Sequence, residues 1–269
     1  MGAINVKHTG AGADIALSSD GTSLLLDGTA IGGGGAALEL YAENPSSPTA
    51  PSATGTNAVA IGTGSVSSAS TSVAIGDRTE ATANQTVAIG SLNTRCSSIQ
   101  GVAIGAARAT GLLGSVAIGG YGSGYSVASN NYSIALGRSN SSGGASFAAA
   151  ITNNTSSYGA TGANSVAMGQ YSRATGGGGI SIGSAFARAD GSQSVAIGRN
   201  VHATDSNSMA LGNEAVSDVR GKLAYSGGKI SATGDSQYGL CVLRQQTTDA
   251  TASVMKTTAY NANPSADNQ

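Results

Sequence analysis

The chain has 269 residues and a formal net charge of −1, and its side chains are mostly small: it contains 41 glycines, two phenylalanines and no tryptophan. Charged residues make up 10% of the sequence, against about 25% in an ordinary globular domain. A disordered chain would carry a higher net charge, and an enzyme with a thick core would need more bulky apolar side chains. The composition therefore favours a fibrous or repetitive protein.

Local features disfavour several other classes of protein. No apolar run reaches about 18 residues, so we expect no insertion into a membrane. Residues 1–10 also lack the basic and apolar regions of a secretory signal. The chain has only four lysines, which disfavours nucleic acid as a partner. Cys96 and Cys241 have no metal-ligand spacing, and we expect them to be two unpaired thiols.

A short repeat organises the middle of the chain. The tetrapeptide Val-Ala-Ile-Gly or a close variant recurs there, and most copies begin fourteen or fifteen positions after the one before. The clear copies begin at Val59, Val73, Val87, Val102, Val116, Ile134, Val166, Ile180, Val195 and Met209. A degenerate copy that begins at Phe147 raises the number of copies to eleven. Repetition at one short period indicates a solenoid.

Each unit has room for two short strands and two tight turns, but not for a helical repeat, which needs about 20 residues. Its single apolar cluster also excludes a coiled coil. Successive Val-Ala-Ile strands are expected to lie side by side about 4.8 Å apart, so the eleven coils would form an all-β rod about 50 Å long.

Alternation along each strand places Val and Ile on one face and Ala on the other. Because both faces are apolar, one can fill the coil while the other needs cover from a second copy, with closed rotational symmetry. We expect the small alanine face to need that partner, so leucine at Ala103 or Ala117 would disturb either the interface or the narrow interior. The closing glycine would supply a positive φ or admit a neighbouring backbone. The residues assigned to the repeat core or interface are Val73, Ala74, Ile75, Gly76, Val102, Ala103, Ile104, Gly105, Val195, Ala196, Ile197 and Gly198.

These units carry a resemblance to a known family. Residues 57–62, 164–169 and 193–198 resemble the YadA-type head repeat, which builds the heads of trimeric autotransporter adhesins and occurs in bacteriophage tail fibres. The resemblance covers about residues 53–216. It implies a left-handed parallel β-roll and a homotrimer.

The flanking segments resemble phage structural fibre proteins, at residues 5–10, 18–24 and 232–244. Autotransporters would add a signal peptide, a coiled-coil stalk and a membrane barrel, none of which the sequence suggests. Residues 120–133 and 138–163 depart from the regular repeat. We expect the roll to be interrupted there, or to be decorated with additional loops.

The sequence thus divides into three parts. Residues 1–52, with short strands at 15–17 and 24–26 and a proline-containing linker, form an attachment region or alternatively a cap on the first coil. Residues 53–216 are the repeats. Residues 217–269 form a different β connector, with strands at 222–225, 240–243 and 253–256, and we expect a tip domain to follow it.

Catalysis finds little support in the sequence. The glycine runs at 32–35 and 176–179 do not lead into a phosphate loop. Nothing positions His202 for a catalytic triad. A polysaccharide depolymerase needs two carboxylates, yet residues 81–189 contain no Asp or Glu. We therefore expect neither enzymatic activity nor a cofactor or metal.

The sequence offers better candidates for binding than for catalysis, because five tyrosines fall in or beside the irregular coils. They could contact a sugar or a protein, or alternatively plug gaps between subunits. The candidate receptor-binding residues are Tyr121, Tyr125, Tyr132, Tyr158, Tyr171 and Arg138.

Five arginines lie within residues 81–189, and the same stretch contains no acidic residue. These arginines would form a basic belt that attracts anionic glycans, or alternatively they would only keep the surface soluble. These arginines are Arg95, Arg108, Arg138, Arg173 and Arg188.

Together these features predict a structural, non-enzymatic phage tail fibre. It would be assembled in the host cytoplasm and located in the virion, with tail or adaptor proteins bound at its N-terminal region. The homotrimer would present repeated surfaces to a host cell-surface glycan or protein. A capsule depolymerase fibre and the head fragment of a trimeric autotransporter adhesin are the alternatives.

Overall fold

All described secondary structure is β-strand, as the sequence predicts. The structure, a computed structural model, describes residues 49–91, 94–121, 124–152 and 157–242, together with four short strands near the N-terminus. The chain divides into two units, Met1–Leu40 and Tyr41–Gln269. The strand expected at residues 253–256 lies outside the described residues.

The N-terminal unit is an antiparallel meander of four strands in the order β1-β2-β3-β4. Their bounds are β1 (Ile4–Val6), β2 (Ile15–Ser19), β3 (Leu24–Leu26) and β4 (Thr29–Ile31). The two short strands that the sequence indicates at 15–17 and 24–26 are β2 and β3.

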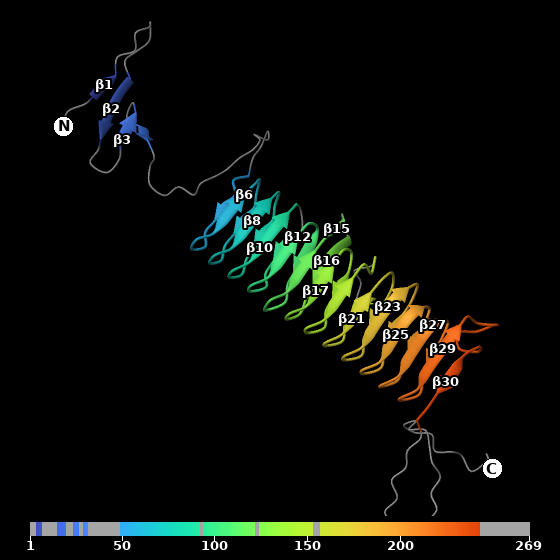
Figure 1. The fold of residues 1–269 in the computed structure, drawn as a ribbon. Coiled ribbons are helices and arrows are strands. Elements are labelled where there is room, and N and C mark those ends of the chain that lie inside the picture. The colour runs from blue at the N-terminus through green and yellow to red at the C-terminus, as the bar shows by residue number, and fades with distance from the viewer. Residues whose placement is uncertain are drawn as a thin grey trace, which may run out of the picture. The chain divides into compact units, whose positions relative to one another are not determined.

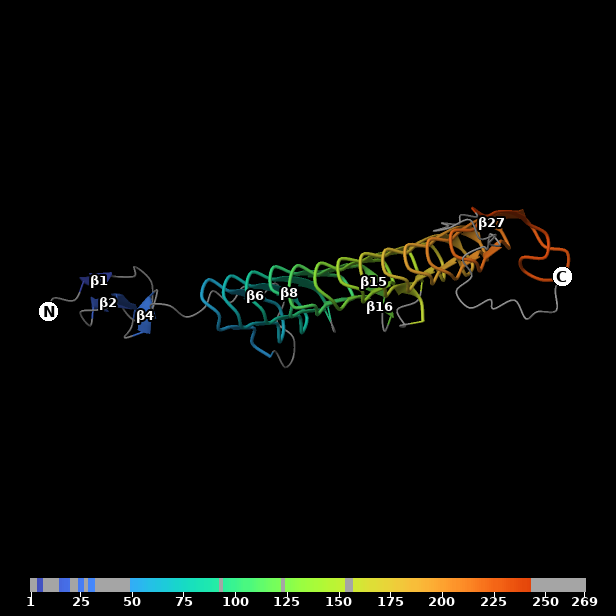
Figure 2. The same ribbon diagram turned by 90° about the horizontal axis from the view of Figure 1, so that it is seen from below.

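The second unit is a parallel β-solenoid of about 12 turns (Figures 1 and 2). One wall, here called the Val-Ala-Ile sheet, consists of β6 (Val59–Ile61), β8 (Val73–Gly76), β10 (Val87–Gly90), β12 (Val102–Ile104), β14 (Val116–Ile118), β17 (Ile134–Leu136), β19 (Phe147–Ala149), β21 (Val166–Met168), β23 (Ile180–Ser184), β25 (Val195–Arg199), β27 (Met209–Asn213) and β29 (Leu223–Gly227). All of these strands pair in parallel and in register, with Val opposite Val and Ala opposite Ala, as in β8 and β10. The backbone ladder therefore aligns every copy of the repeat.

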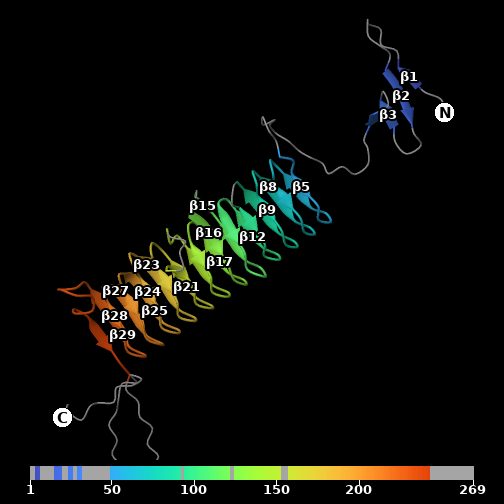
Figure 3. The same cartoon turned by 180° about the vertical axis from the view of Figure 1, so that it is seen from behind.

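The opposite wall, here called the short-strand sheet, is visible from behind in Figure 3. It consists of β5 (Ser52–Ala53), β7 (Val66–Ser67), β9 (Glu80–Ala81), β11 (Arg95–Cys96), β13 (Ala107–Ala109), β16 (Gly124–Ala128), β18 (Asn140–Ser141), β20 (Gly159–Ala160), β22 (Arg173–Ala174), β24 (Arg188–Ala189), β26 (His202–Ala203) and β28 (Val216–Ser217). Each coil thus contributes one strand to each wall, as the period of the repeat predicts.

The solenoid runs further than the predicted end of the repeats at residue 216. In β29, Leu223, Ala224 and Tyr225 lie opposite the Met-Ala-Leu of β27 in the same parallel register. This twelfth copy was not counted in the sequence because it lacks the closing Ile-Gly. After it, β30 (Tyr238–Leu240) pairs with β29 antiparallel, which ends the parallel stack.

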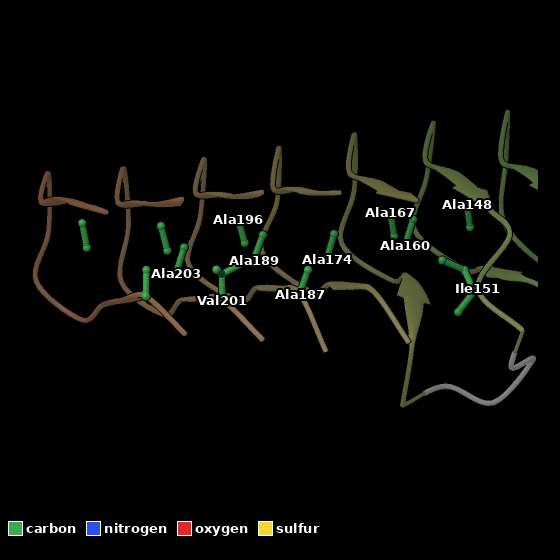
Figure 4. Close-up of a cluster of buried hydrophobic side chains, with 13 residues drawn as sticks. Ala148, Ile151, Ala160, Ala167, Ala174, Ala187, Ala189, Ala196, Val201 and Ala203 are labelled. Atoms are coloured by element: carbon green, nitrogen blue, oxygen red, sulfur yellow. The ribbon is translucent and has the colours of Figure 1, made fainter. Parts of the chain in front are cut away.

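The alanines fill the interior, and the expectation that they need a partner subunit is wrong. Ala74, Ala103 and Ala196 are fully buried within the single chain, and so are the alanines of the opposite wall from Ala81 onward. Figure 4 shows the two rows of alanines pointing toward each other between the walls. Because Val and Ile alternate with Ala, their side chains point outward.

Buried hydroxyls complete the narrow interior at the corners. Ser72, Ser133 and Ser208 each donate a hydrogen bond of 2.6 Å to the carbonyl three residues earlier, in the turn that precedes the Val-Ala-Ile strand. Each bond satisfies a buried polar group and closes the turn. The interior is therefore filled mainly by Ala, Ser and Thr, with Cys96, Ile151 and Val201 as larger buried side chains, which explains the composition.

One residue per coil adopts the left-handed conformation two positions before each Val-Ala-Ile strand. These residues are Asn57, Thr71, Gln85, Gln100, Gly114, Tyr132, Ala145, Asn164, Gly178, Gln193, Asn207 and Gly221, with φ between 50° and 71°. From Thr71 onward, their backbone N–H groups bond to the turn of the preceding coil, as Gln85 does to Ser70 at 2.9 Å. The turns therefore stack like the strands.

The glycine that closes the Val-Ala-Ile-Gly motif serves both expected purposes. Gly198 has φ of 138°, and a Cβ atom there would lie 1.8 Å from the carbonyl oxygen of Gly212 in the next coil. Gly76 has φ of 124° and would meet Gly90 in the same way, at 1.6 Å. Side chains are excluded here by the next backbone.

Gly198→Ala should therefore destabilise the solenoid by about 1–3 kcal/mol, because alanine at this φ is strained and its methyl group displaces the next coil. Gly227→Ala is the matched control, since a Cβ atom there meets nothing within 4 Å. Urea denaturation followed by circular dichroism would measure both. Equal stability of the two variants would contradict the close-approach explanation.

The two cysteines are free, as expected. Cys96 is fully buried at an alanine position of β11, opposite Ala81 and Ala109 in the neighbouring strands. Burial raises the pKa of its thiol. Cys241 is exposed.

Candidate functional site

The outward side of the Val-Ala-Ile sheet is one continuous apolar surface, which we call the Val–Ile face. It consists of the first and third residues of the motif in each of its parallel strands from β6 to β29, and every one of these residues is apolar. Ile104, Ile118 and Ile197 are 37%, 38% and 41% exposed in the single chain. A stack of 12 strands extends this face over about 50 Å.

The predicted repeat residues thus separate into two sets. Ala74, Ala103 and Ala196 are core residues, whereas the outward positions belong to the Val–Ile face: Val73, Ile75, Val102, Ile104, Val195 and Ile197. The glycines Gly76, Gly105 and Gly198 all have positive φ at the turn that follows.

The candidate tyrosines lie at three separate places rather than in one site. The interruption at 120–133 contains a hairpin of β15 (Gly120–Tyr121) and β16, in which Tyr121 pairs with Gly124. Tyr125 of this hairpin is half-buried, and the guanidinium of Arg108 lies 4.1 Å from the centre of its ring. Arg138 is exposed and its side chain lies against Gly124. The hairpin therefore lies beside basic side chains of the neighbouring coils.

Tyr132 occupies the left-handed turn on the other edge of the solenoid. It is 57% exposed, and its ring lies over Gly114, the equivalent turn residue of the preceding coil. The ring therefore fills space between two coils of the same chain.

Tyr158 and Tyr171 form an aromatic cluster with Phe186, a residue that the sequence analysis did not single out. Tyr171 and Phe186 stack with ring centres 5.3 Å apart and planes 13° apart, and Tyr158 lies 5.1 Å from Tyr171. The three residues come from consecutive coils at the same corner. The signal for Phe186 was the extra residue in its coil, because the motif after Ile180 begins at Val195, one position later than a fourteen-residue spacing would place it.

Phe186 is held in an unusual backbone conformation. Its φ is 72°, directly after Ala185 with φ of 51°, and its side chain is 43% exposed. Bulky residues rarely adopt positive φ, and such strain gathers at functional sites. The cluster is therefore not explained by burial alone.

Three of the five arginines of the predicted basic belt pair with two acidic residues, and these carboxylates offset part of the charge of the belt. Arg95 lies 2.7 Å from Glu80 on the adjacent strand. Arg173 and Arg188 both pair with Asp190. Glu80 and Asp190 fall just outside the stretch 81–189, but the coil brings residues about one period apart into contact.

A shallow pocket of about 130 Å³ lies beside the aromatic cluster and is lined by Ser157, Tyr158, Arg173, Phe186 and Arg188. Burial alone would raise the pKa of Asp190, but hydrogen bonds from Arg173 and Thr175 outweigh burial and hold this pKa below its ordinary value. Burial and the charge of Arg188 lower the pKa of His202 on the adjacent strand, so this imidazole is neutral at pH 7.

A second buried carboxylate, Glu214, ties the loop at 228–237 to the solenoid. Its side chain is 7% exposed, accepts hydrogen bonds from Thr233 at 2.6 Å and Asn200 at 2.5 Å, and lies 3.5 Å from Lys229. The bond from Thr233, with those from Asn200 and Lys229, lowers the pKa of Glu214. The loop also donates the Gly234 N–H to the Glu214 carbonyl at 2.8 Å.

A pH dependence follows from this lowered pKa. The stabilisation by Glu214 is complete above the unfolded value of about 4.3 and is lost as the pH falls through the folded pKa. The protection of the amides of residues 228–237, measured relative to their intrinsic exchange rates at each pH, should therefore fall below about pH 4.3 in the native protein. Glu214→Gln removes the charge that pairs with Lys229. It should therefore lower the free energy of opening of this loop by about 1–3 kcal/mol, and so speed amide exchange already at pH 7.

Glu80→Gln provides the matched control, since the Glu80–Arg95 pair is solvent-exposed at 42% and 54% and such pairs contribute little. If both variants exchanged at the native rate throughout, Glu214 would not anchor the loop.

Two other kinds of site are absent from the described part of the chain. No group of three or more His, Cys, Asp or Glu residues there is placed to hold a metal ion. Nor does that part contain a helix long and apolar enough to span a bilayer.

Comparison with known families identifies the repeat. The model of the YadA head domain repeat (2 copies) matches residues 53–79, 67–93, 160–185 and 189–215. The solenoid therefore contains YadA head domain repeats, at both sides of the irregular coils that carry the hairpin and the long turns. No curated protein matched the chain.

Proposed function

We propose that this chain is a structural segment of a homotrimeric, adhesin-like fibre, and that the fibre is a bacteriophage tail fibre. The observation that carries the proposal is the Val–Ile face, an unbroken apolar surface on a solenoid of YadA head repeats. Soluble monomers rarely leave apolar patches larger than a few hundred Å² exposed. Closed rotational symmetry covers the same face on every copy.

In the proposed trimer the Val–Ile face of each chain turns toward the shared axis. The short-strand sheet and the irregular corners then remain available for contact with a host cell-surface glycan or protein. Three copies of every surface loop lie around one axis, so weak contacts add through effective concentration. The N-terminal unit would attach the fibre to tail or adaptor proteins.

The proposed role is mechanical rather than enzymatic. Hydrolysis of a polysaccharide by paired carboxylates needs one that stays protonated near neutral pH. The pKa values of four described carboxyl groups, Asp190, Glu214, Asp218 and Asp235, are held below the ordinary ones, and residues 81–189 contain no Asp or Glu. On the proposed role, incubation with host capsule should release no reducing ends, and release of them would support a depolymerase instead.

Sedimentation equilibrium tests the assembly. The mass of one chain is 25.9 kDa, and the protein should sediment with three times this mass across usable concentrations. A stable, folded monomer would contradict the proposal.

Immunogold electron microscopy tests the biological setting, with an antibody raised against the solenoid. We expect label on fibres that project from phage tails. Label on the surface of uninfected bacteria would instead indicate the head of a trimeric autotransporter adhesin.

A further inference from the structure

The pocket beside the aromatic cluster contains two arginines for one acidic group. Asp190 accepts a hydrogen bond of 2.8 Å from Arg173 Nε and one of 3.0 Å from Arg188 Nη2, and its side chain is only 17% exposed. Two guanidinium groups and one carboxylate leave a local charge of about +1. Because His202 is neutral at pH 7, it does not alter this charge.

Part of the Arg188 guanidinium is open at this pocket. The side chain lines the pocket and is 37% exposed, although its Nη2 atom is held by Asp190 and its Nε atom is buried. Guanidinium groups bind carboxylates well through their N–H donors. The ion pair with Asp190 also fixes the side chain, so little freedom would be lost when an acceptor binds.

An aromatic wall stands beside these donors. Phe186 and Tyr158 line the same pocket as Arg188, and Phe186 is partly exposed in a strained backbone conformation. Aromatic faces suit an apolar ring surface. The volume of about 130 Å³ corresponds to roughly four water molecules, which is room for a carboxylate and part of a ring.

We propose that this pocket binds the carboxylate-bearing ring of an acidic saccharide, such as a uronic acid unit of a surface glycan. The carboxylate accepts from Arg188, and the ring lies against Phe186 and Tyr158. A single negative charge matches the local charge of +1 better than a phosphate dianion does. The inference rests on the proposed function, since it names the class of glycan that the fibre would recognise.

Saturation-transfer NMR on the intact protein tests the proposal with methyl β-D-glucuronide as the probe. Methyl β-D-glucoside, in which a hydroxymethyl group replaces the carboxylate, should bind at least about tenfold more weakly. Arg188→Lys keeps the charge but removes the planar donors, and should weaken glucuronide binding by about tenfold. Phe186→Leu should weaken both sugars.

Arg95→Lys is the matched control, because Arg95 lies in the same column of the short-strand sheet but away from the pocket. It should leave glucuronide binding unchanged. Equal binding of the two sugars, tighter binding of inorganic phosphate, or the same loss in Arg95→Lys would each overturn the proposal.

Sedimentation and circular dichroism of each variant separate loss of binding from loss of fold. If Arg188→Lys failed to fold, Phe186→Leu and the comparison of the two sugars would still decide. A native trimer that adsorbs to cells but ignores glucuronide would refute only this inference. Absence of the trimer would instead refute the proposed function.

Discussion

Lysine at both Ile104 and Ile118 is expected to convert the protein from a trimer to a monomer with the single-chain mass of 25.9 kDa. The two residues pair with each other across β12 and β14 on the Val–Ile face. Six ammonium groups would then be buried in the assembled fibre, at several kcal/mol each. Sedimentation equilibrium measures the outcome.

The single chain should tolerate the same double change. Both side chains point outward and are more than a third exposed, so the interior and the strand ladders are untouched. The matched control is lysine at Val66 and Val127, two outward residues of the short-strand sheet, which should leave the trimer intact. If Ile104→Lys with Ile118→Lys remained trimeric, the Val–Ile face would not be the interface.

The period alone was enough to predict the architecture. Copies of one motif at so short and constant a spacing can only pair in register if the chain coils once per copy, and the structure shows this register from β6 to β27. The role of the closing glycine was predictable for the same reason, because each turn must lie directly against the next.

The inward direction of the alanines was not predictable from alternation, because both faces of the strand are apolar. The residue that precedes the motif, which is serine in many coils, has the same parity as the alanine, and serine is ordinarily found on the exposed face of a strand. Ser72 is nevertheless fully buried with Ala74, since its hydroxyl is satisfied by its own turn. A local hydrogen bond therefore reversed the usual meaning of a polar residue.

The candidate site depended on contacts between coils that a linear reading hides. Arg173 meets Asp190 across 17 positions, and Tyr171 meets Phe186 across 15. Charge counted along a stretch of sequence misses such pairs. An alignment of the repeats with one another, one coil below the next, places these residues in adjacent rows. Such an alignment would have predicted the contacts between them.

Ala103→Leu is expected to disrupt the solenoid itself, with a loss at or above the upper end of the range of about 1–3 kcal/mol for an overpacked core. Ala103 is fully buried, with Ala88 and Ala117 directly opposite it in the neighbouring strands. A leucine cannot enter the row without separating the two walls. Because each coil is stabilised by its neighbours, the damage should spread along the stack.

Urea denaturation and limited proteolysis measure this effect, with cleavage expected within the coils around β12. The control is Ala109→Cys, since Cys96 already occupies the equivalent buried position of the adjacent strand. One sulfur atom at that position fits the interior, so the control should lose less than about 1.5 kcal/mol. Native stability of Ala103→Leu would mean that the interior is wide enough for large side chains. The predominance of alanine in the strand interiors would then need a cause other than close packing.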